Sequence, residues 1–270
     1  MKKLIAVALA AVAFCAVAEK KNVVESDNTV GFNKIKIVPG LNLIGTAFLK
    51  VDCSGRPDIQ ATFLDCKGKA HTGEGDDVAD YIQIFDWSKK GYFNNYFFYA
   101  NPEEPDPDYD YKWLDNNDYE PTDFVIPSCN AFWYTARGEE TFELTAAGGV
   151  GEEDVQVTLK PGLNLIVNPF PCDLVLNSEA VNWQDAGCNF GEGDDVADYI
   201  QVFDGERKGY FNNYFFYANP AEPDPDYDYK WLDNNDYEPT DFAVPANGGF
   251  WYTCRGDKDI TLTFKCPLAK

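Results

Sequence analysis

The sequence predicts an all-β protein made of two tandem antiparallel β-sandwich or partly closed barrel domains. Three observations support this: a long internal duplication, many short β-prone segments between turn residues, and little helical periodicity. The stretch 73–127 recurs at 191–245 with a constant offset of 118, and only seven of its 55 positions differ. This period far exceeds the roughly 20 to 50 residues of solenoid repeats, so each copy is expected to have its own core.

Within a copy, segments rich in β-branched and aromatic residues alternate with clusters of Pro, Gly, Asn and Asp, which favour turns. In the first copy the expected strands are 34–38, 41–48, 81–85, 92–99, 111–114, 124–126, 131–135 and 141–144. No segment longer than two turns has helical periodicity, although residues 76–80 could form one helical turn. Many short strands with turns between them are typical of sandwiches and barrels.

The weaker flanks of the duplicated block extend each copy to about the length of a domain. We therefore expect β domains at 34–146 and 155–268. The segment 146–153 is rich in glycine and contains two adjacent glutamates, as is typical of a short linker. The copies should then behave as two beads on one chain.

The first eighteen residues have the three parts of a secretory signal: a basic start, an apolar run and the small residues Ala16 and Ala18 around Val17. Cleavage is expected before Glu19. A lipoprotein signal needs a small residue before the acylated cysteine, and Phe14 precedes Cys15. The mature protein is expected to be secreted, periplasmic or at the cell surface.

The chain is strongly acidic. Its formal charge is −23, and removal of Lys2 and Lys3 with the signal makes it −25. Such a charge repels nucleic acid and anionic lipid. No apolar run approaches the roughly 20 residues that span a bilayer, so neither nucleic acid nor membrane insertion is expected. The aromatic content of 16% argues against disorder.

Seven cysteines remain after signal removal, so at least one is unpaired or pairs between molecules. Local disulfides Cys53–Cys66 and Cys172–Cys188 are favoured, because each would close a short loop in the part of the chain where the copies differ most. With no C-x-x-C pair and a single histidine, a zinc site or a thioredoxin-like site is not expected.

Three motifs of the second copy suggest a family. They are GLNLIVNPFP at 162–171, YIQVFDG at 199–205 and GGFW at 248–251. They resemble an uncharacterised β module that is repeated in bacterial secreted and cell-surface proteins. The first copy departs from the leading motif at 45–48, where it reads GTAF. The resemblance implies an extracellular, non-catalytic β domain and supplies no site residues.

The acidic loops are candidate cation sites, because calcium takes roughly 6 to 8 oxygen ligands and D-x-D-x-D spacing lets carboxylates converge. The candidate ligands are Asp106, Asp108, Asp110, Asp115 and Asp118, with Asp224, Asp226, Asp228, Asp233 and Asp236 in the second copy. The loop is not an EF-hand, since Tyr111 stands where glycine is needed. A solvated acidic loop is the alternative.

Most aromatic residues in the strands should build cores, because strand alternation sends about half of any run inward. Tyrosines flanked by acids are the better candidates for contact with a glycan or a surface partner. They are Tyr109, Tyr119, Tyr227 and Tyr237.

No catalytic constellation is evident. Each candidate carboxylate of the block occurs twice, and two identical active sites in one chain are uncommon. His71 aligns with Asn189, so no catalytic triad has support from the repeat. The sequence therefore predicts a non-catalytic protein that binds a glycan, a cation or a surface partner, or is a structural surface component. The alternative is a carbohydrate-active hydrolase or its accessory carbohydrate-binding module.

Overall fold

The structure is a computed structural model that describes residues 29–86, 92–207 and 209–268. The predicted signal peptide and its cleavage site before Glu19 lie outside the described residues. The regular secondary structure of the described chain is nearly all strand, in several antiparallel sheets and without a closed barrel. The all-β fold class is therefore confirmed, and the sheets are consistent with sandwich-like domains.

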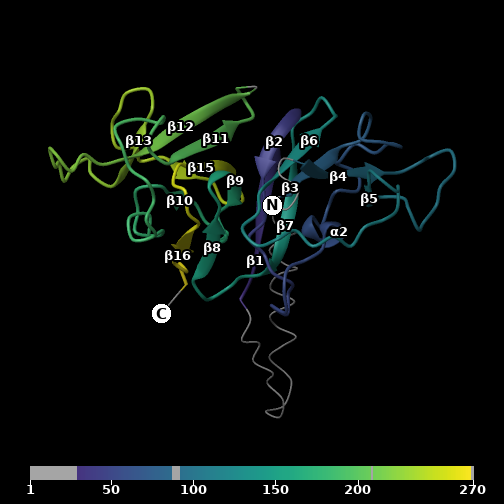
Figure 1. Cartoon of the computed structure of the whole chain (residues 1–270). Helices are drawn as coiled ribbons and strands as arrows, with labels where there is room; N and C mark the ends of the chain where they lie inside the picture. The colour runs from purple at the N-terminus through teal and green to yellow at the C-terminus, as the bar shows by residue number, and fades with distance from the viewer. Residues whose placement is uncertain (1–28, 87–91, 208, 269–270) are drawn as a thin grey trace, which may run out of the picture.

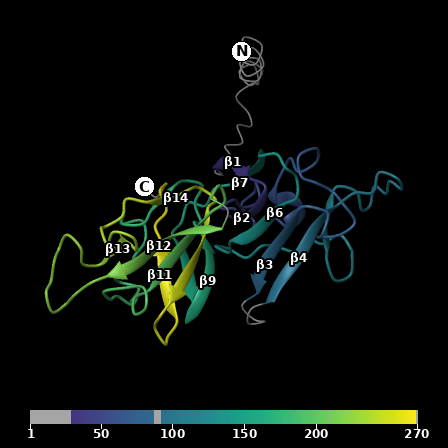
Figure 2. The same cartoon turned by 90° about the horizontal axis from the view of Figure 1, so that it is seen from above.

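Each copy contains one five-stranded antiparallel sheet, and the two sheets have equivalent strand orders (Figures 1 and 2). The first sheet has the order β2 (Gly40–Ile44), β6 (Phe132–Ala136), β3 (Tyr81–Asp86), β4 (Tyr92–Tyr99), β5 (Lys112–Asp115). The second has the order β9 (Gly162–Val167), β15 (Gly249–Cys254), β11 (Tyr199–Asp204), β12 (Tyr210–Tyr217), β13 (Lys230–Asp233).

A second layer of short elements covers one face of each sheet. It includes two two-stranded antiparallel sheets, which pair β1 (Val30–Ile37) with β7 (Phe142–Gly149) and β8 (Val155–Leu159) with β16 (Ile260–Phe264). The first copy adds the single turn α2 (Ile59–Thr62), and the second adds β10 (Leu174–Val175) paired with β14 (Ala243–Val244). The strand expected at 124–126 is wrong for the first copy, where Val125 makes only an isolated bridge to Asp58.

Each copy has its own core between these layers. Trp113 and Tyr134 lie at the centre of the first core, and Trp231 and Tyr252 lie at the equivalent places in the second. The expected burial of aromatic side chains is confirmed for Tyr96, Phe97, Phe98 and Trp113.

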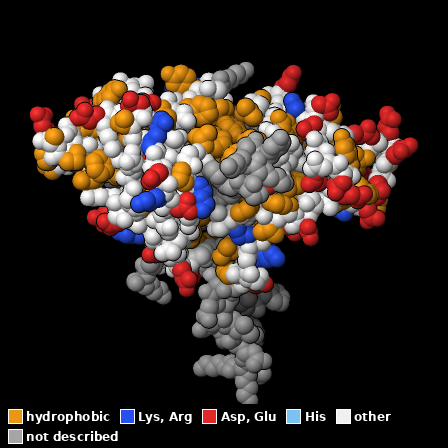
Figure 3. All heavy atoms as spheres, viewed as in Figure 1, with side chains coloured by type: hydrophobic (Ala, Val, Ile, Leu, Met, Phe, Trp, Pro, Cys, Tyr) orange, Lys and Arg blue, Asp and Glu red, His pale blue; other side chains and the backbone are white. Residues whose placement is uncertain are grey.

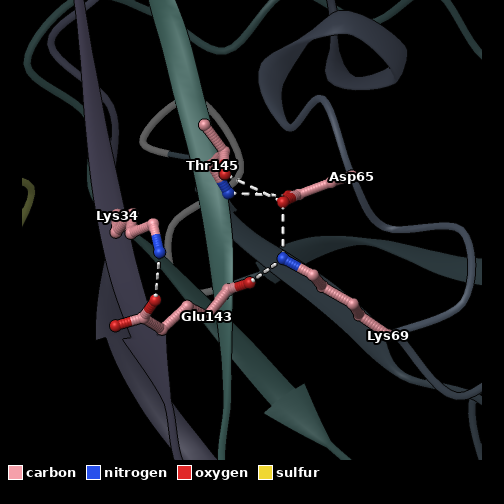
Figure 4. Close-up of polar contacts among 5 residues, drawn as sticks. All are labelled: Lys34, Asp65, Lys69, Glu143 and Thr145. Carbon is pink, nitrogen blue, oxygen red and sulfur yellow. Dashed lines mark hydrogen bonds and ion pairs between the residues drawn. The ribbon is translucent and has the colours of Figure 1, made fainter. Parts of the chain in front are cut away.

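Five polar residues fasten the β1–β7 pair to the loop after α2 (Figure 4). Asp65 accepts hydrogen bonds from Thr145 N (2.7 Å) and Thr145 Oγ1 (2.8 Å), and Lys69 Nζ donates to Asp65 Oδ2 and to the carbonyl of Glu143. Lys34 pairs with Glu143 at 2.8 Å. Burial alone would raise the pKa of Asp65, but the hydrogen bonds from Lys69 and Thr145 outweigh it and hold the pKa below its usual value.

The expected linker is partly strand, because β7 continues to Gly149. A Cβ on Gly148 would lie 2.0 Å from the carbonyl oxygen of Leu49, and one on Gly149 would lie 2.8 Å from that of Lys50. These glycines therefore allow a close approach of two backbone segments and do not mark a flexible joint.

The two copies are in contact with one another and are more than beads on a chain. Their interface, called the seam here, is symmetric about an approximate twofold axis. Gly45 N donates to Asn247 O at 2.9 Å, and Val167 N donates to Cys129 O at 3.0 Å. Gly45 and Val167 hold the same place in their copies, as do Cys129 and Asn247. The same hydrogen bond is thus made twice, which is the mark of an isologous contact.

The apolar part of the seam obeys the same symmetry. Phe85 meets Trp251 edge to face with ring centroids 5.7 Å apart, and Phe203 meets Trp133 in the same way at 4.9 Å. These rings surround buried aliphatic side chains from both copies: Leu43, Ala131, Leu165 and Val167. Each copy therefore contributes the same patch to one shared apolar cluster.

Two pairs of equivalent residues touch one another at the axis. A Cβ on Gly45 would lie 2.8 Å from the Cβ of Val167, and a Cβ on Gly249 would lie 2.6 Å from the Cβ of Ala131. Side chains at equivalent positions next to the axis would occupy the same volume. Only one member of each pair can therefore have a side chain. This explains why the first copy departs from the leading motif at Gly45.

We expect Gly45→Val to lower the free energy of unfolding by about 1–3 kcal/mol, because the new side chain overpacks the axis. The double variant Gly45→Val/Val167→Gly should recover most of this loss, since it moves the same side chain across the axis. Urea denaturation of the full chain measures both. Equal losses in the single and double variants would contradict the axis.

Candidate functional site

The predicted cation ligands lie in two acidic arms, residues 101–111 and 219–229, and in the turns that follow them. The arms follow β4 and β12 and extend from opposite ends of the molecule (Figure 1), where acidic side chains gather (Figure 3). Asp110 accepts hydrogen bonds from Asn101 N (3.1 Å) and Asp106 N (3.2 Å), and Asp106 accepts from Asp108 N (2.8 Å). The second arm repeats these contacts through Asp228 and Asp224.

The turns after the arms use their aspartates in the same way. Asp115 accepts from Asn117 N and Asp118 accepts from Glu120 N, and Asp233 and Asp236 make the equivalent bonds. Within the described ranges, no group of three His, Cys, Asp or Glu side chains is arranged to hold a metal ion. The calcium site stays a prediction that this geometry does not support.

The predicted ligand-binding tyrosines have two different environments. Tyr109 donates to Glu120 at 2.8 Å and packs against another tyrosine ring, and Tyr227 does the same with Glu238 at 2.7 Å. Tyr119 and Tyr237 remain 52% and 53% exposed, although one edge of each ring contacts a phenylalanine. Both have a φ of 62°, which is uncommon for a bulky residue.

The seam forms a different candidate site, which the sequence analysis missed. Of the hollows along the seam, two correspond to one another in the two copies, with volumes of about 480 and 460 Å³. Groove A is lined by Asp86, Asn94, Phe124, Cys129, Leu165 and Ile166. Groove B is lined, in the same order, by Asp204, Asn212, Phe242, Asn247, Leu43 and Ile44. The grooves are therefore equivalent under the twofold relation, and each needs both copies.

Both grooves combine a carboxylate, an amide and an aromatic ring. In groove A, Asn94 Nδ2 lies 3.5 Å from Asp86 Oδ2. In groove B, Asp204 Oδ1 accepts from the backbone N of Glu206 (3.0 Å) and Arg207 (3.2 Å). An ion pair between Lys36 and Glu206 joins the two copies beside groove B.

Among the equivalent positions at which the two groove linings differ, one holds a buried amide in groove B and a thiol in groove A. Groove B has Asn247, which is 1% exposed, and neither its Oδ1 nor its Nδ2 has a hydrogen-bond partner among the residues that the structure describes. Groove A has Cys129 there, whose Sγ lies 3.6 Å from Ser128 Oγ. A buried amide without partners is rare, because it loses water without replacing it. The only sequence signal was the mismatch of Cys129 with Asn247 beside the matched FWYT motifs.

The most deeply buried carboxylates have a structural role. Asp80 accepts from Tyr134 Oη (2.8 Å) and Arg137 N (2.6 Å), which ties β3 to the end of β6. Asp198 makes the same contacts with Tyr252 and Arg255 in the second copy. Burial raises the pKa of both carboxyls, and these hydrogen bonds oppose the rise only in part.

Comparison with known protein families, with characterised proteins and with solved structures found no match. The resemblance to the secreted β module stays a prediction. In the part of the chain that the structure describes, no helix is long and apolar enough to cross a membrane. Fold and grooves together define a tandem all-β protein with two related hollows at its internal seam.

The raised pKa of Asp198 predicts a pH dependence of stability. Its folded-state pKa lies above the unfolded value of about 3.9, so its contribution is complete below that pH and is lost as the pH rises through the folded pKa. As the pH rises from the unfolded pKa to the folded pKa, the free energy of unfolding of the wild type should therefore fall relative to that of Asp198→Asn. The fall should be about 1.4 kcal/mol for each unit by which the folded pKa exceeds the unfolded pKa. Tyr252→Phe, which removes a hydrogen bond to the carboxylate, should steepen the loss. Urea titrations across pH measure this, and a constant difference from wild type would contradict it.

Proposed function

We propose that this chain is a secreted, non-catalytic binding protein that holds a hydroxyl-rich ligand, a sugar unit of a glycan, in groove B. The observation that supports this best is Asn247, a residue at the wall of groove B whose buried amide has neither its donor nor its acceptor paired within the described chain. A hydroxyl both donates and accepts, so a ligand with neighbouring hydroxyls satisfies both ends of one amide.

The rest of groove B fits the same ligand class. Asp204 and Asn212 add polar groups, and Phe242 adds an apolar ring against which the C–H face of a sugar packs. Ligand pockets commonly combine an apolar lining with a few placed polar groups. The strongly negative charge disfavours polyanionic ligands, and the arm carboxylates cap their own backbone.

Groove A supplies a second, related site. It keeps a carboxylate (Asp86), an amide (Asn94) and a ring (Phe124), but Cys129 replaces the unpaired amide of Asn247. We therefore expect groove A to bind the same ligand class more weakly. Two sites in one rigid pair favour a repetitive glycan, because linked sites raise avidity without new contacts.

A glycan array with the purified mature chain would identify the ligand, and Asn247→Gly would then locate the site. Asn247 has a φ of 63°, which glycine adopts without strain, so this change removes the amide and keeps the backbone. We expect binding to fall about 10-fold or more, because a hydrogen-bonding site is lost, while the melting temperature stays equal or rises.

Cys129→Gly is the matched control, since Cys129 has a φ of 59° at the equivalent place in groove A. It should leave the tighter binding unchanged. Full binding by Asn247→Gly, or an equal loss in both variants, would contradict the assignment of groove B.

A further inference from the structure

Two buried cysteines of the second copy occupy positions where the first copy has two alanines. Cys188 aligns with Ala70 and Cys254 with Ala136. Backbone contacts agree with this alignment: Lys69 N donates to Cys66 O at 3.0 Å, and Gly187 N donates to Gln184 O at 3.1 Å, directly before Ala70 and Cys188. Two positions that are far apart in sequence have thus changed together between the copies.

One carboxylate holds these two positions close together. Asp198 Oδ2 accepts from Asn189 N at 3.0 Å, and Asp198 Oδ1 accepts from Arg255 N at 2.7 Å. Asn189 follows Cys188, and Arg255 follows Cys254. The two cysteine backbones are therefore attached to the two oxygens of a single carboxyl group.

Both thiols also face the same core. Cys188 and Cys254 are buried members of one apolar cluster. Negative charge on Cys254 would add to the rise that burial causes in the pKa of Cys188. Ala70 and Ala136 are likewise buried together in the core of the first copy. A concerted exchange of two small core side chains for two thiols is what an added cross-link requires.

We propose that Cys188 and Cys254 form a disulfide that cross-links the second copy alone. In the structure every described cysteine is a free thiol, so the expected Cys53–Cys66 and Cys172–Cys188 bonds are absent. The structure therefore corresponds to the reduced form of the protein, in which Cys188 and Cys254 are also thiols. The two thiols lose two protons and two electrons as the S–S bond forms. A low-molecular-weight disulfide accepts both and leaves as two thiols. Cys172 is exposed, whereas Cys188 lies in the core, which argues against their pairing.

We expect the disulfide to form while the chain folds, before the two thiols are buried. Burial raises the pKa of Cys188 to about 12 and that of Cys254 to about 11, so the reactive thiolate is scarce in the folded chain. The test therefore refolds the reduced full chain in a glutathione redox buffer, blocks the remaining thiols with an alkylating reagent and maps the peptides without reduction.

We expect one peptide pair joined through Cys188 and Cys254, and alkylated Cys66 and Cys129. A reducing agent should lower the melting temperature of the oxidised chain by about 10 °C, because a long loop is released. The variant Cys188→Ala/Cys254→Ala restores the alanine pair of the first copy and should show no response to reduction. Alkylated Cys188 in the refolded chain, or Cys188 joined to Cys172, would overturn the proposal.

Discussion

The constraint on which the structure depends is the seam, where two copies of one module meet about an approximate twofold axis. At the axis, Gly45 faces Val167 and Gly249 faces Ala131, and each pair has room for one side chain only. Away from the axis the contacts repeat in pairs, as the two edge-to-face contacts of Phe85 and Phe203 illustrate. The seam fixes the two sheets relative to one another, produces the two grooves and directs the acidic arms outward.

The copies have diverged at places where their environments force or permit a difference. The block from 73 to 127 remains nearly identical in the second copy, because it forms the centre of each sheet, the arm and the turn after it. The differences at the axis relieve a steric conflict. The exchange of Cys129 for Asn247 has no such cause, since both residues lie off the axis in equivalent hollows. A difference that packing does not require is a reasonable place for a difference in binding.

A buried carboxyl performs the same task in both copies. Asp80 and Asp198 each join the start of a central strand to the end of its neighbour, through a tyrosine hydroxyl and a backbone N–H. The backbone of His71 in the first copy and that of Asn189 in the second also bond to these carboxyls, and the second copy places a cysteine beside each bonded backbone group. The copies therefore share a scaffold, while the second holds additional polar and sulfur chemistry around it.

The sequence alone determined the fold class, the duplication and most strands, because these depend on residue periodicity and on turn residues that are close along the chain. It did not determine what distant residues do. The aspartates at 106, 108 and 110 looked like convergent ligands, yet the carboxylate oxygens of Asp106 and Asp110 accept backbone N–H groups, since an aspartate in a tight turn meets its own backbone first. Gly148 and Gly149 looked like a linker and instead admit a neighbouring segment. Only the tertiary structure decided the seam, the grooves and the attachment of the backbones next to Cys188 and Cys254 to one carboxyl group, because these depend on how two folded copies and distant parts of one copy meet.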